Sequence, residues 1–357
     1  MNEAAKKPQK VRIPGTALHA MVKSMFERLG TSAADAATVA DVLVWANLRG
    51  VDSHGISRIP RYVEMFASGE AKARASLRVT QPRAALIGID ADGAPGPVAM
   101  QRAAVEARTL AATTGIAWAA VRGTVHTGAI GYYASQVAEA GMIGIGLVAG
   151  VPNMAYAGSS AAGVATSPIA IAVPSGKHGT VLLDMATAVI ALGKIAQYRQ
   201  SGTPLEPGMA LTEQGQPTTD PALAEIPLPM GGAKGSGLSL MIEFLSGVLV
   251  GNPIVAEFHS GTPEGQRHRQ NGTIIAVDIS AYGPLDAFRS QVDAAIEAIK
   301  KLPRAEGSVE IFFPGERSSR VFAERSSKGI PLAPGPWQKL CKDAEKLGVT
   351  PAAPVAG

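Results

Sequence analysis

Hydrophobic residues recur at helical spacing near both ends of the chain, whereas the middle mixes helical spacing with short apolar runs. Residues 15–29 carry apolar side chains three and four positions apart, and residues 32–50 repeat the pattern behind Ser32 and Asp35, which resemble a helix capping box. The same spacing returns after residue 314. Both ends of the chain are therefore predicted to be mainly helical.

The middle of the chain alternates between strand-like and helix-like segments. Short apolar runs bounded by turn residues predict strands over residues 77–81, 85–91, 116–121, 142–149, 169–173, 181–183, 273–279 and 309–313. Helical spacing predicts helices over residues 57–68, 97–113, 128–140, 187–198, 236–250, 284–301, 318–327 and 336–347. We expect an α/β protein with a mixed-sheet core at 76–313 and a mainly helical domain built from residues 13–75 and 314–350.

Composition and charge exclude several classes of protein. The 357 residues are 46% hydrophobic, and the net charge of +4 is spread along the chain, so nucleic acid is not an expected partner. Cys341 is the single cysteine, which rules out an intrachain disulfide and a cysteine-based metal site. The N-terminus lacks the apolar run of a signal peptide, and the apolar stretch 141–150 is too short to span a bilayer. We expect a cytoplasmic protein without a membrane partner.

Two glycine-rich segments are candidates for binding a phosphate group. Residues 144–150 contain Gly-x-Gly spacing, but they lie inside a strand-like run and no helix start follows, so they do not fit a Rossmann fingerprint. Residues 232–237 precede a long helix, whose free backbone N–H groups favour an anion, and Lys234 adds a full positive charge. A plain turn before a core helix explains the second segment equally well.

The most suggestive polar cluster is Ser53, His54 and Arg58. An imidazole can exchange a proton with a carbonyl oxygen during hydride transfer, and a neighbouring hydroxyl can hold the ring. Arg58 lies four residues after His54, on the same side of a helical turn, and a guanidinium can grip a carboxylate with two bonds. The alternative is a helix-capping Ser-His pair beside a solvated arginine, which spacing alone favours.

His126 and Asp184 each follow a predicted strand. Ligands in α/β proteins gather at strand ends, so His126 is a candidate for contact with substrate, although a loop histidine bonded to backbone fits as well. Asp184 fits a cap of the helix that follows it better than a cofactor ligand. The sequence has no spacing of a metal site, so no metal is expected; four histidines lie in surface-like contexts, namely His19, His178, His259 and His268.

Taken together, these segments resemble the type-2 malate/L-lactate dehydrogenase family, which is unrelated to the Rossmann lactate dehydrogenases. The matching runs follow one another from about residue 15 to 345, and each is weak alone, whereas eight in order are specific. They are LRGVDSHGISR at 48–58, HTGAIGYYA at 126–134, TSPIA at 166–170, DMAT at 184–187, GK at 193–194, GQPTTDP at 215–221, KGSGL at 234–238 and PGE at 314–316.

The resemblance implies an NAD(P)-binding fold without the classical dinucleotide fingerprint, and a homodimer. It implies that His54 donates the proton with Ser53 beside it, that Arg58 binds the substrate carboxylate, and that Thr166 touches the substrate. It also places His126 at the nicotinamide and substrate, with an acid/base role in some relatives. The cofactor, NAD or NADP, would be lined by His126, Thr127, Gly128, Ala129, Ile130, Asp184, Met185, Ala186, Lys234, Pro314, Gly315 and Glu316.

The sequence departs from the family pattern at three places. Ser167 replaces the Asn of a Thr-Asn-Pro run, and Leu192 stands where an Arg often precedes Gly-Lys. The loss of that Arg suggests a smaller or less charged substrate. The segment 149–158 lacks the usual Asn/Ser turn, which leaves the contacts with the adenosine end undefined.

The expected function is the NAD(P)H-dependent reversible reduction of a small 2-oxo acid to its 2-hydroxy acid. Three alternatives lie within the same family: reduction of a cyclic imine carboxylate such as Δ1-piperideine-2-carboxylate or Δ1-pyrroline-2-carboxylate, oxidation of ureidoglycolate, and reduction of diketogulonate. A binding protein that kept the fold without catalysis, and a metal hydrolase, are alternatives of other classes. The intact polar residues argue against the first of these, and the absence of clustered ligands argues against the second.

Overall fold

The computed structural model describes residues 10–261 and 266–355. The chain forms two compact units, which are described separately. The helical unit contains residues up to 68 and from 317 onward, and the sheet unit contains residues 69–316. The chain therefore passes between the units twice, after Ser68 and after Glu316.

The helical unit joins the two ends of the chain through a short antiparallel strand pair, in which Ile13 lies opposite Ile330. Its core is apolar and includes Phe26, whose ring meets that of Tyr62 edge to face at 5.6 Å. Ser32 caps its second helix by accepting the Asp35 N–H, as predicted. The elements are β1 Val11–Ile13, α1 Gly15–Arg28, α2 Ala33–Leu48, η1 Asp52–His54, η2 Ile56–Arg58, α3 Ile59–Ala67, α10 Glu316–Lys328, β14 Ile330–Leu332 and α11 Pro334–Lys346.

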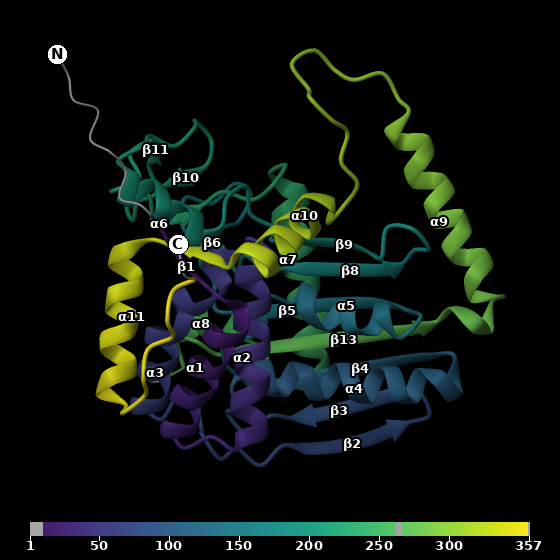
Figure 1. The fold of residues 1–357 in the computed structure, drawn as a ribbon, viewed down its shortest axis with the longest axis horizontal. Coiled ribbons are helices and arrows are strands. Elements are labelled where there is room, and N and C mark those ends of the chain that lie inside the picture. Colours follow the sequence, from purple (N-terminus) through teal and green to yellow (C-terminus); the bar gives the residue numbers. More distant parts are fainter. Residues whose placement is uncertain (1–9, 262–265, 356–357) are drawn as a thin grey trace. The chain divides into compact units, whose positions relative to one another are not determined.

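The sheet unit is built on a seven-stranded mixed sheet of order β2-β3-β4-β13-β5-β8-β9 (Figure 1). Strands β3 and β4 run parallel, and the other neighbouring pairs run antiparallel. This arrangement differs from a doubly wound parallel sheet. The strands are β2 Arg78–Arg83, β3 Leu86–Asp90, β4 Ile116–Thr124, β5 Met142–Gly150, β8 Ile169–Pro174, β9 Thr180–Met185 and β13 Gln270–Asp278.

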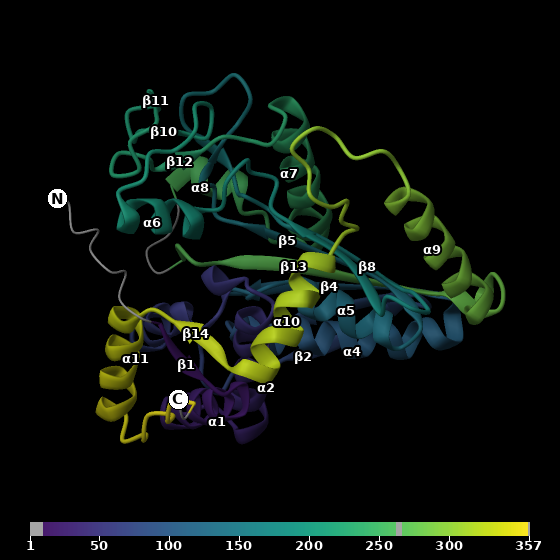
Figure 2. The ribbon, with the colours of Figure 1, turned by 45° about the horizontal axis from the view of Figure 1, so that its top comes forward.

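Helices cover both faces of this sheet. Figure 2 shows α4 Gly96–Thr114 and α5 Gly131–Glu139 on one face and α7 Ala233–Ser246 on the other. Glycine allows the close approach of α5 to the sheet, because a Cβ on Gly144 would overlap the Ala134 carbonyl. The remaining elements are β6 Met154–Ala155, β7 Ala162–Val164, α6 Leu192–Ser201, β10 Ala210–Leu211, β11 Pro217–Thr218, β12 Ile226–Pro227, η3 Val248–Val250, α8 Val255–Gly261, η4 Ile279–Ala281 and α9 Leu285–Lys300.

Two predicted elements are wrong. Residues 309–313 form no strand, because the backbone of this largely half-buried segment pairs with none of the strands in the described part of the chain. The helix predicted from Thr187 begins only at Leu192, since the Thr187 N–H bonds to the Thr166 carbonyl and its own carbonyl accepts from the Met230 N–H. Tertiary hydrogen bonds thus replace a helical turn at this position.

Candidate active site

The helical unit brings Ser53, His54 and Arg58 together in the turn between α2 and α3. The Ser53 hydroxyl lies 3.0 Å from Nδ1 of His54, and Arg58 Nε donates to the Ser53 carbonyl at 2.5 Å. Pro60 lies in the first turn of α3, where the N–H group that proline lacks would have no partner within the helix. No side-chain cap hydrogen bond is formed at η1 or α3, so the alternative of a capping serine beside a solvated arginine does not describe this turn.

Burial dominates the electrostatics of this turn. It lowers the pKa of His54 to about 4, and the positive charges of Arg58 and Arg61 act in the same direction. Burial also lowers the pKa of Arg58, but a guanidinium remains charged in proteins. The turn therefore presents a neutral imidazole beside a cation at neutral pH.

Two residues that the sequence motifs did not include, Asn47 and Arg325, support this turn together with Gly55 of the 48–58 run. Asn47 is buried on an otherwise apolar stretch of α2, and its Oδ1 accepts the Ile56 N–H at 2.8 Å while its Nδ2 donates to Asp52 at 2.7 Å. Arg325 donates to both carboxylate oxygens of Asp52, at 2.6 and 3.1 Å. A Cβ on Gly55 would overlap the Asn47 side chain, so this glycine is required by close approach. The sequence signal that could have revealed Asn47 is a polar residue at a position of α2 where the helical spacing predicts an apolar one.

In the sheet unit, strand topology gathers the predicted cofactor residues at one end of the sheet. Strand β13 is antiparallel to β4 and β5, so its start, at Gln270, lies opposite Thr124 and Gly150, where those two strands end. Strand β8 begins and β9 ends at the same edge, where Ile169 pairs with Met185. The loop 126–130, Thr166 and the segment 184–186 all adjoin these strand ends.

The loop at His126 is held by short-range hydrogen bonds. His126 is 8% exposed, and its Nδ1 accepts the Gly128 N–H at 3.3 Å. Since Nδ1 serves as the acceptor in this bond, Nε2 is the ring nitrogen that can donate a hydrogen bond. The Tyr133 hydroxyl donates to the Thr127 carbonyl at 2.6 Å and ties the loop, which continues through Ala129 and Ile130, to α5.

Asp184 caps a helix, but not the helix predicted from the sequence. Its Oδ2 accepts the Gly131 N–H at 3.1 Å, at the start of α5, which precedes Asp184 by about fifty residues. A Cβ on Gly131 would overlap the same carboxylate. The next helix, α6, begins only at Leu192, which removes the predicted capping role there. Asp184 therefore joins β9 to the helix that follows the His126 loop, and Met185 and Ala186 are half-buried beyond it.

Thr166 and the first turn of α7, which contains Lys234, both contact Thr187. Thr166 donates its N–H to Asn153 and its carbonyl accepts from Thr187. Gly235, in the first turn of α7, packs so closely on the Thr187 carbonyl that a Cβ would overlap it. Lys234 is exposed in the same turn, and its backbone N–H donates to the Gly231 carbonyl at 3.3 Å. Its side chain forms no hydrogen bond or ion pair with the residues that the structure describes. The segment thus offers a free ammonium group at a helix N-terminus.

The segment 314–316 packs along β9. The Pro314 carbonyl accepts the Leu182 N–H at 3.2 Å, and Gly315, with a φ of +86°, approaches Leu182 too closely for a side chain. The Glu316 carboxylate is buried, and both of its oxygens accept hydrogen bonds from Lys300 Nζ at 2.7 Å. Glu316 is thus held by an ion pair inside the sheet unit.

The residues present fit a dinucleotide without a Rossmann fingerprint. The glycines at 144–150 lie within β5, and no helix starts directly after them, whereas α7 begins at Ala233 behind Gly231 and Gly232, both with positive φ. The N–H groups of Lys234, Gly235 and Ser236 bond to the Gly231, Met230 and Gly232 carbonyls. The exposed ammonium group of Lys234 is therefore the group available to a phosphate at this helix start. Among residues 10–261 and 266–355, no group of three or more His, Cys, Asp or Glu could hold a metal ion.

The helical unit presents a neutral histidine beside an arginine in one turn. The sheet unit presents a buried histidine at a strand end and an exposed lysine at a helix start. The match to known proteins defines the chain as a dehydrogenase-type oxidoreductase. The chain belongs to the malate/L-lactate dehydrogenase family, whose model matches residues 13–341. It is 34% identical to malate dehydrogenase of Pyrococcus horikoshii over 95% of this chain and 96% of that protein. It is 30% identical to the NAD(+) ureidoglycolate dehydrogenase of Escherichia coli O157:H7 over 94% of this chain and 96% of that protein.

Two solved structures share the fold. The malate dehydrogenase structure from P. horikoshii OT3 matches with a TM-score of 0.87 at 31% identity, covering 97% of this chain and 98% of that one. The delta1-piperideine-2-carboxylate reductase from Pseudomonas syringae pv. tomato matches with a TM-score of 0.83 at 27% identity, covering 93% of this chain and 99% of that one. The predicted family membership and enzyme class are therefore confirmed.

Proposed function

We propose that this protein catalyses the reversible NAD(P)H-dependent reduction of a small 2-oxo acid to the 2-hydroxy acid. The observation that carries the proposal is the turn in which Ser53, His54 and Arg58 are hydrogen-bonded together. The names of the relatives, malate dehydrogenase and hydroxycarboxylate dehydrogenase among them, support the substrate class.

In this mechanism Arg58 binds the substrate carboxylate, and its bond to the Ser53 carbonyl sets the direction of the guanidinium. His54 exchanges the proton of the C2 oxygen, with Ser53 on its Nδ1 holding the ring. Thr166 is proposed to touch the substrate, and His126 is proposed to direct its Nε2–H toward the nicotinamide and substrate. When bound, the nicotinamide supplies or accepts the hydride at C2.

The protonation state of His54 in the free enzyme suits the oxidation of the 2-hydroxy acid. With a pKa of about 4, the imidazole of the free enzyme is neutral and is ready to accept a proton, as the oxidation of a 2-hydroxy acid requires. In the reverse direction, a substrate carboxylate on Arg58 offsets one of the positive charges that disfavour the imidazolium. Substrate binding thus assists protonation of His54 for reduction.

We propose that the cofactor, NAD or NADP, is held by the non-Rossmann edge of the sheet unit. His126, Thr127, Gly128, Ala129 and Ile130 would bind near the nicotinamide. Lys234, at the start of α7, would bind a phosphate group. The other proposed lining residues are Asp184, Met185, Ala186, Pro314, Gly315 and Glu316.

Reduction of a cyclic imine carboxylate is the second candidate function. It is favoured by the structural match to the delta1-piperideine-2-carboxylate reductase. Arg58 and His54 would serve that reaction equally, since a ring imine also carries an adjacent carboxylate and takes up one proton. The third candidate, oxidation of ureidoglycolate, rests on the sequence match to ureidoglycolate dehydrogenase.

A substrate panel tests the proposal directly. Oxidation of NADH and of NADPH is followed by absorbance with 2-oxo acids and with cyclic imine carboxylates, and oxidation of ureidoglycolate is followed in the reverse direction. We expect the highest kcat/KM with a small 2-oxo acid, because Leu192 leaves the substrate site with one cation fewer than the family pattern. Preference for the cyclic imine would select the second candidate. If fluorescence titration showed no saturable binding of NADH or of NADPH, the proposed dehydrogenase activity would be ruled out.

We also propose that the protein is a cytoplasmic homodimer and that α7 with η3 contributes to its interface. Residues 233–250 are apolar enough, by length and composition, to cross a membrane, and 39% of that stretch is buried within the fold. The same stretch leaves large apolar side chains exposed, which indicates a surface covered by protein. These are Met241 at 51%, Phe244 at 45%, Val248 at 51% and Leu249 at 62%.

Charge on this face is expected to separate the subunits. Replacing Met241 and Phe244 together with Asp should halve the mass measured by sedimentation equilibrium, because two charges would be buried in an apolar contact. Val309→Asp, at an exposed apolar position on a loop, is the matched control and should leave the mass unchanged. A wild-type protein recovered as a monomer, or found only in the membrane fraction, would contradict the proposal.

A further inference from the structure

Four consecutive residues at the start of β13 each bind a different segment of the sheet unit. Their side chains reach the chain just after Ser68, the loop after η3, the His126 loop and the end of β4. In order, the pairs are His268 with Glu70, Arg269 with Asn252 and Glu257, Gln270 with Thr127, and Asn271 with Gly123. The prediction that His268 lies in a surface-like context is wrong, since its side chain is 9% exposed and its ring meets Glu70 at 2.5 Å.

An irregularity in the sheet places the side chains of these residues. The step from Gln270 to Gly272 on β13 is matched by the longer step from Thr124 to Val121 on β4, so β4 carries one extra residue. Such bulges bend a strand and redirect side chains, and they are common beside active sites. The Gly123 N–H left by the bulge donates to Asn271 Oδ1 at 3.0 Å.

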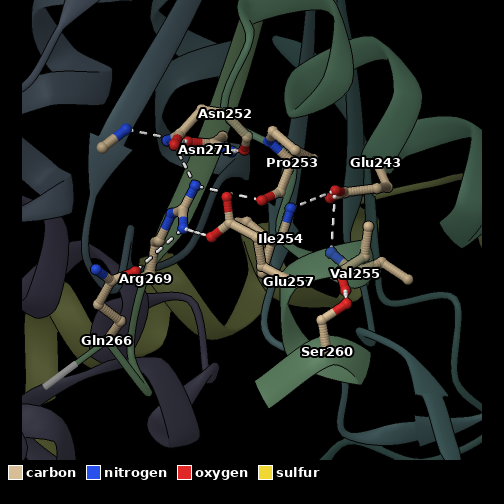
Figure 3. Close-up of polar contacts among 12 residues, drawn as sticks. Glu243, Asn252, Pro253, Ile254, Val255, Glu257, Ser260, Gln266, Arg269 and Asn271 are labelled. Carbon is tan, nitrogen blue, oxygen red and sulfur yellow. Dashed lines mark hydrogen bonds and ion pairs between the residues drawn. The ribbon is translucent and has the colours of Figure 1, made fainter. Parts of the chain in front are cut away.

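The neighbours of Gln270 are fixed by a hydrogen-bond network (Figure 3). Asn271 is fully buried, and it exchanges two hydrogen bonds of 2.7 Å with Asn252, through its Oδ1 and its Nδ2. Arg269 donates to Asn252 and Glu257, and also to Gln266 and the Pro253 carbonyl. The guanidinium is thereby satisfied by protein groups, so the network serves to hold the backbone of β13 in place.

The Gln270 side chain acts on the His126 loop itself. Its Oε1 accepts the Thr127 N–H at 2.8 Å, and Thr127 is only 2% exposed. This N–H belongs to the peptide that links His126 to Thr127. On the other side of the same peptide, Gly96 lies so close to the His126 carbonyl that a Cβ would overlap it. The peptide is clamped between a glycine and an amide oxygen, so a change at Gln270 is passed to the His126 ring.

We propose that Gln270 is a positioning residue for His126. The inference rests on the proposed function, in which His126 lies at the nicotinamide and substrate. Orientation of a catalytic side chain has a steep effect on rate, because small displacements remove the alignment of the reacting atoms. Gln270 touches neither substrate nor cofactor in this proposal and acts through the Thr127 N–H alone.

The test compares Gln270→Met, which lacks the acceptor oxygen at similar size, with Gln270→Glu, which keeps it. Gln270→Met should lower kcat about tenfold while KM for the 2-oxo acid and Kd for NADH change less than about twofold. Gln270→Glu should restore kcat to within about threefold of the wild type. The control Gln101→Met removes another partly buried glutamine hydrogen bond, to Gln136 at 2.8 Å, and should leave kcat unchanged at a similar Tm.

The outcomes separate this inference from the proposed function. If His126→Ala leaves kcat unchanged, the role proposed for His126 fails. If His126→Ala lowers kcat but Gln270→Met behaves like Gln101→Met, or if Gln270→Glu restores nothing, the positioning role of Gln270 fails. If Gln270→Met does not fold, Gln270→Asp takes its place. The aspartate side chain is one methylene shorter, so its oxygen lies farther from the Thr127 N–H, and kcat should be lower than in Gln270→Glu.

Discussion

Replacing His54 with alanine is expected to lower kcat by about 10²–10⁴-fold, the range typical for losing a general acid–base group. The side chain occupies the turn that carries Arg58, with Ser53 on its Nδ1, and no other histidine lies in the helical unit's α2–α3 turn. Affinity for NADH should be retained, because the residues proposed to hold the cofactor belong to the sheet unit.

The measurement is steady-state kcat and KM together with NADH fluorescence titration. His19→Ala is the matched control, since His19 lies on α1 and pairs with Asp41 at 2.8 Å, outside the turn. A His54→Ala enzyme with near wild-type kcat would remove His54 from the chemistry. A variant that also loses NADH binding would point to a misfolded protein or to a different site.

The lowered pKa of His54 adds a pH dependence to this prediction. Since the neutral imidazole is the base for oxidation, kcat/KM for the 2-hydroxy acid should fall only as the pH drops toward about 4, rather than near the usual 6.5. The folded pKa lies below the unfolded one, so the unfolded chain takes up the proton first. The stability contributed by neutral His54 is therefore present above about pH 6.5 and is lost as the pH falls toward 4.

Replacing Arg58 with lysine is expected to raise KM for the carboxylate substrate by about 10–100-fold, the equivalent of about 1.5–3 kcal/mol for a hydrogen bond to a charged group. Lysine keeps the charge but loses the planar pair of N–H groups that meets a carboxylate. It also loses the Nε bond to the Ser53 carbonyl that holds the guanidinium. Initial-rate measurements over a wide range of substrate concentration test this expectation.

Arg28→Lys provides the control for this substitution, because Arg28 is exposed at the end of α1. Its KM should equal that of the wild type. An unchanged KM in Arg58→Lys would place the carboxylate elsewhere, and Arg61, the other arginine that depresses the pKa of His54, would be the next residue to test. A fall in kcat without a change in KM would assign Arg58 to the transition state alone.

The hydrophobic pattern predicted the secondary structure well where the signal was local. The helices at both ends of the chain and the paired strands at 77–91 are confirmed. Prediction was wrong where distant hydrogen bonds decided the backbone, as at 187–191 and 309–313. The strand pair β1–β14 was not predicted, since strands of three residues separated by more than three hundred positions leave no periodic trace.

The candidate site shows the same division. Ser53, His54 and Arg58 were recognisable because they are close in sequence and their residue types suit proton transfer and carboxylate binding. Asp184 was assigned to the wrong helix, because its partner Gly131 comes from an earlier part of the chain. The supporting bonds from Arg325 and Gln270 also join residues remote in sequence, whereas the two bonds of Asn47, with Asp52 and Ile56, are local.

Local chemistry was thus enough to determine the α/β class, the family and the turn that carries His54 and Arg58. Each of these depends on residue type and short-range spacing, which periodicity and motifs record directly. The tertiary structure decided the mixed order of the sheet, the gathering of loop 126–130 with segment 184–186 at one sheet edge, and the burial that lowers the pKa of His54. These features depend on contacts between segments far apart in the chain, and no local pattern encodes them.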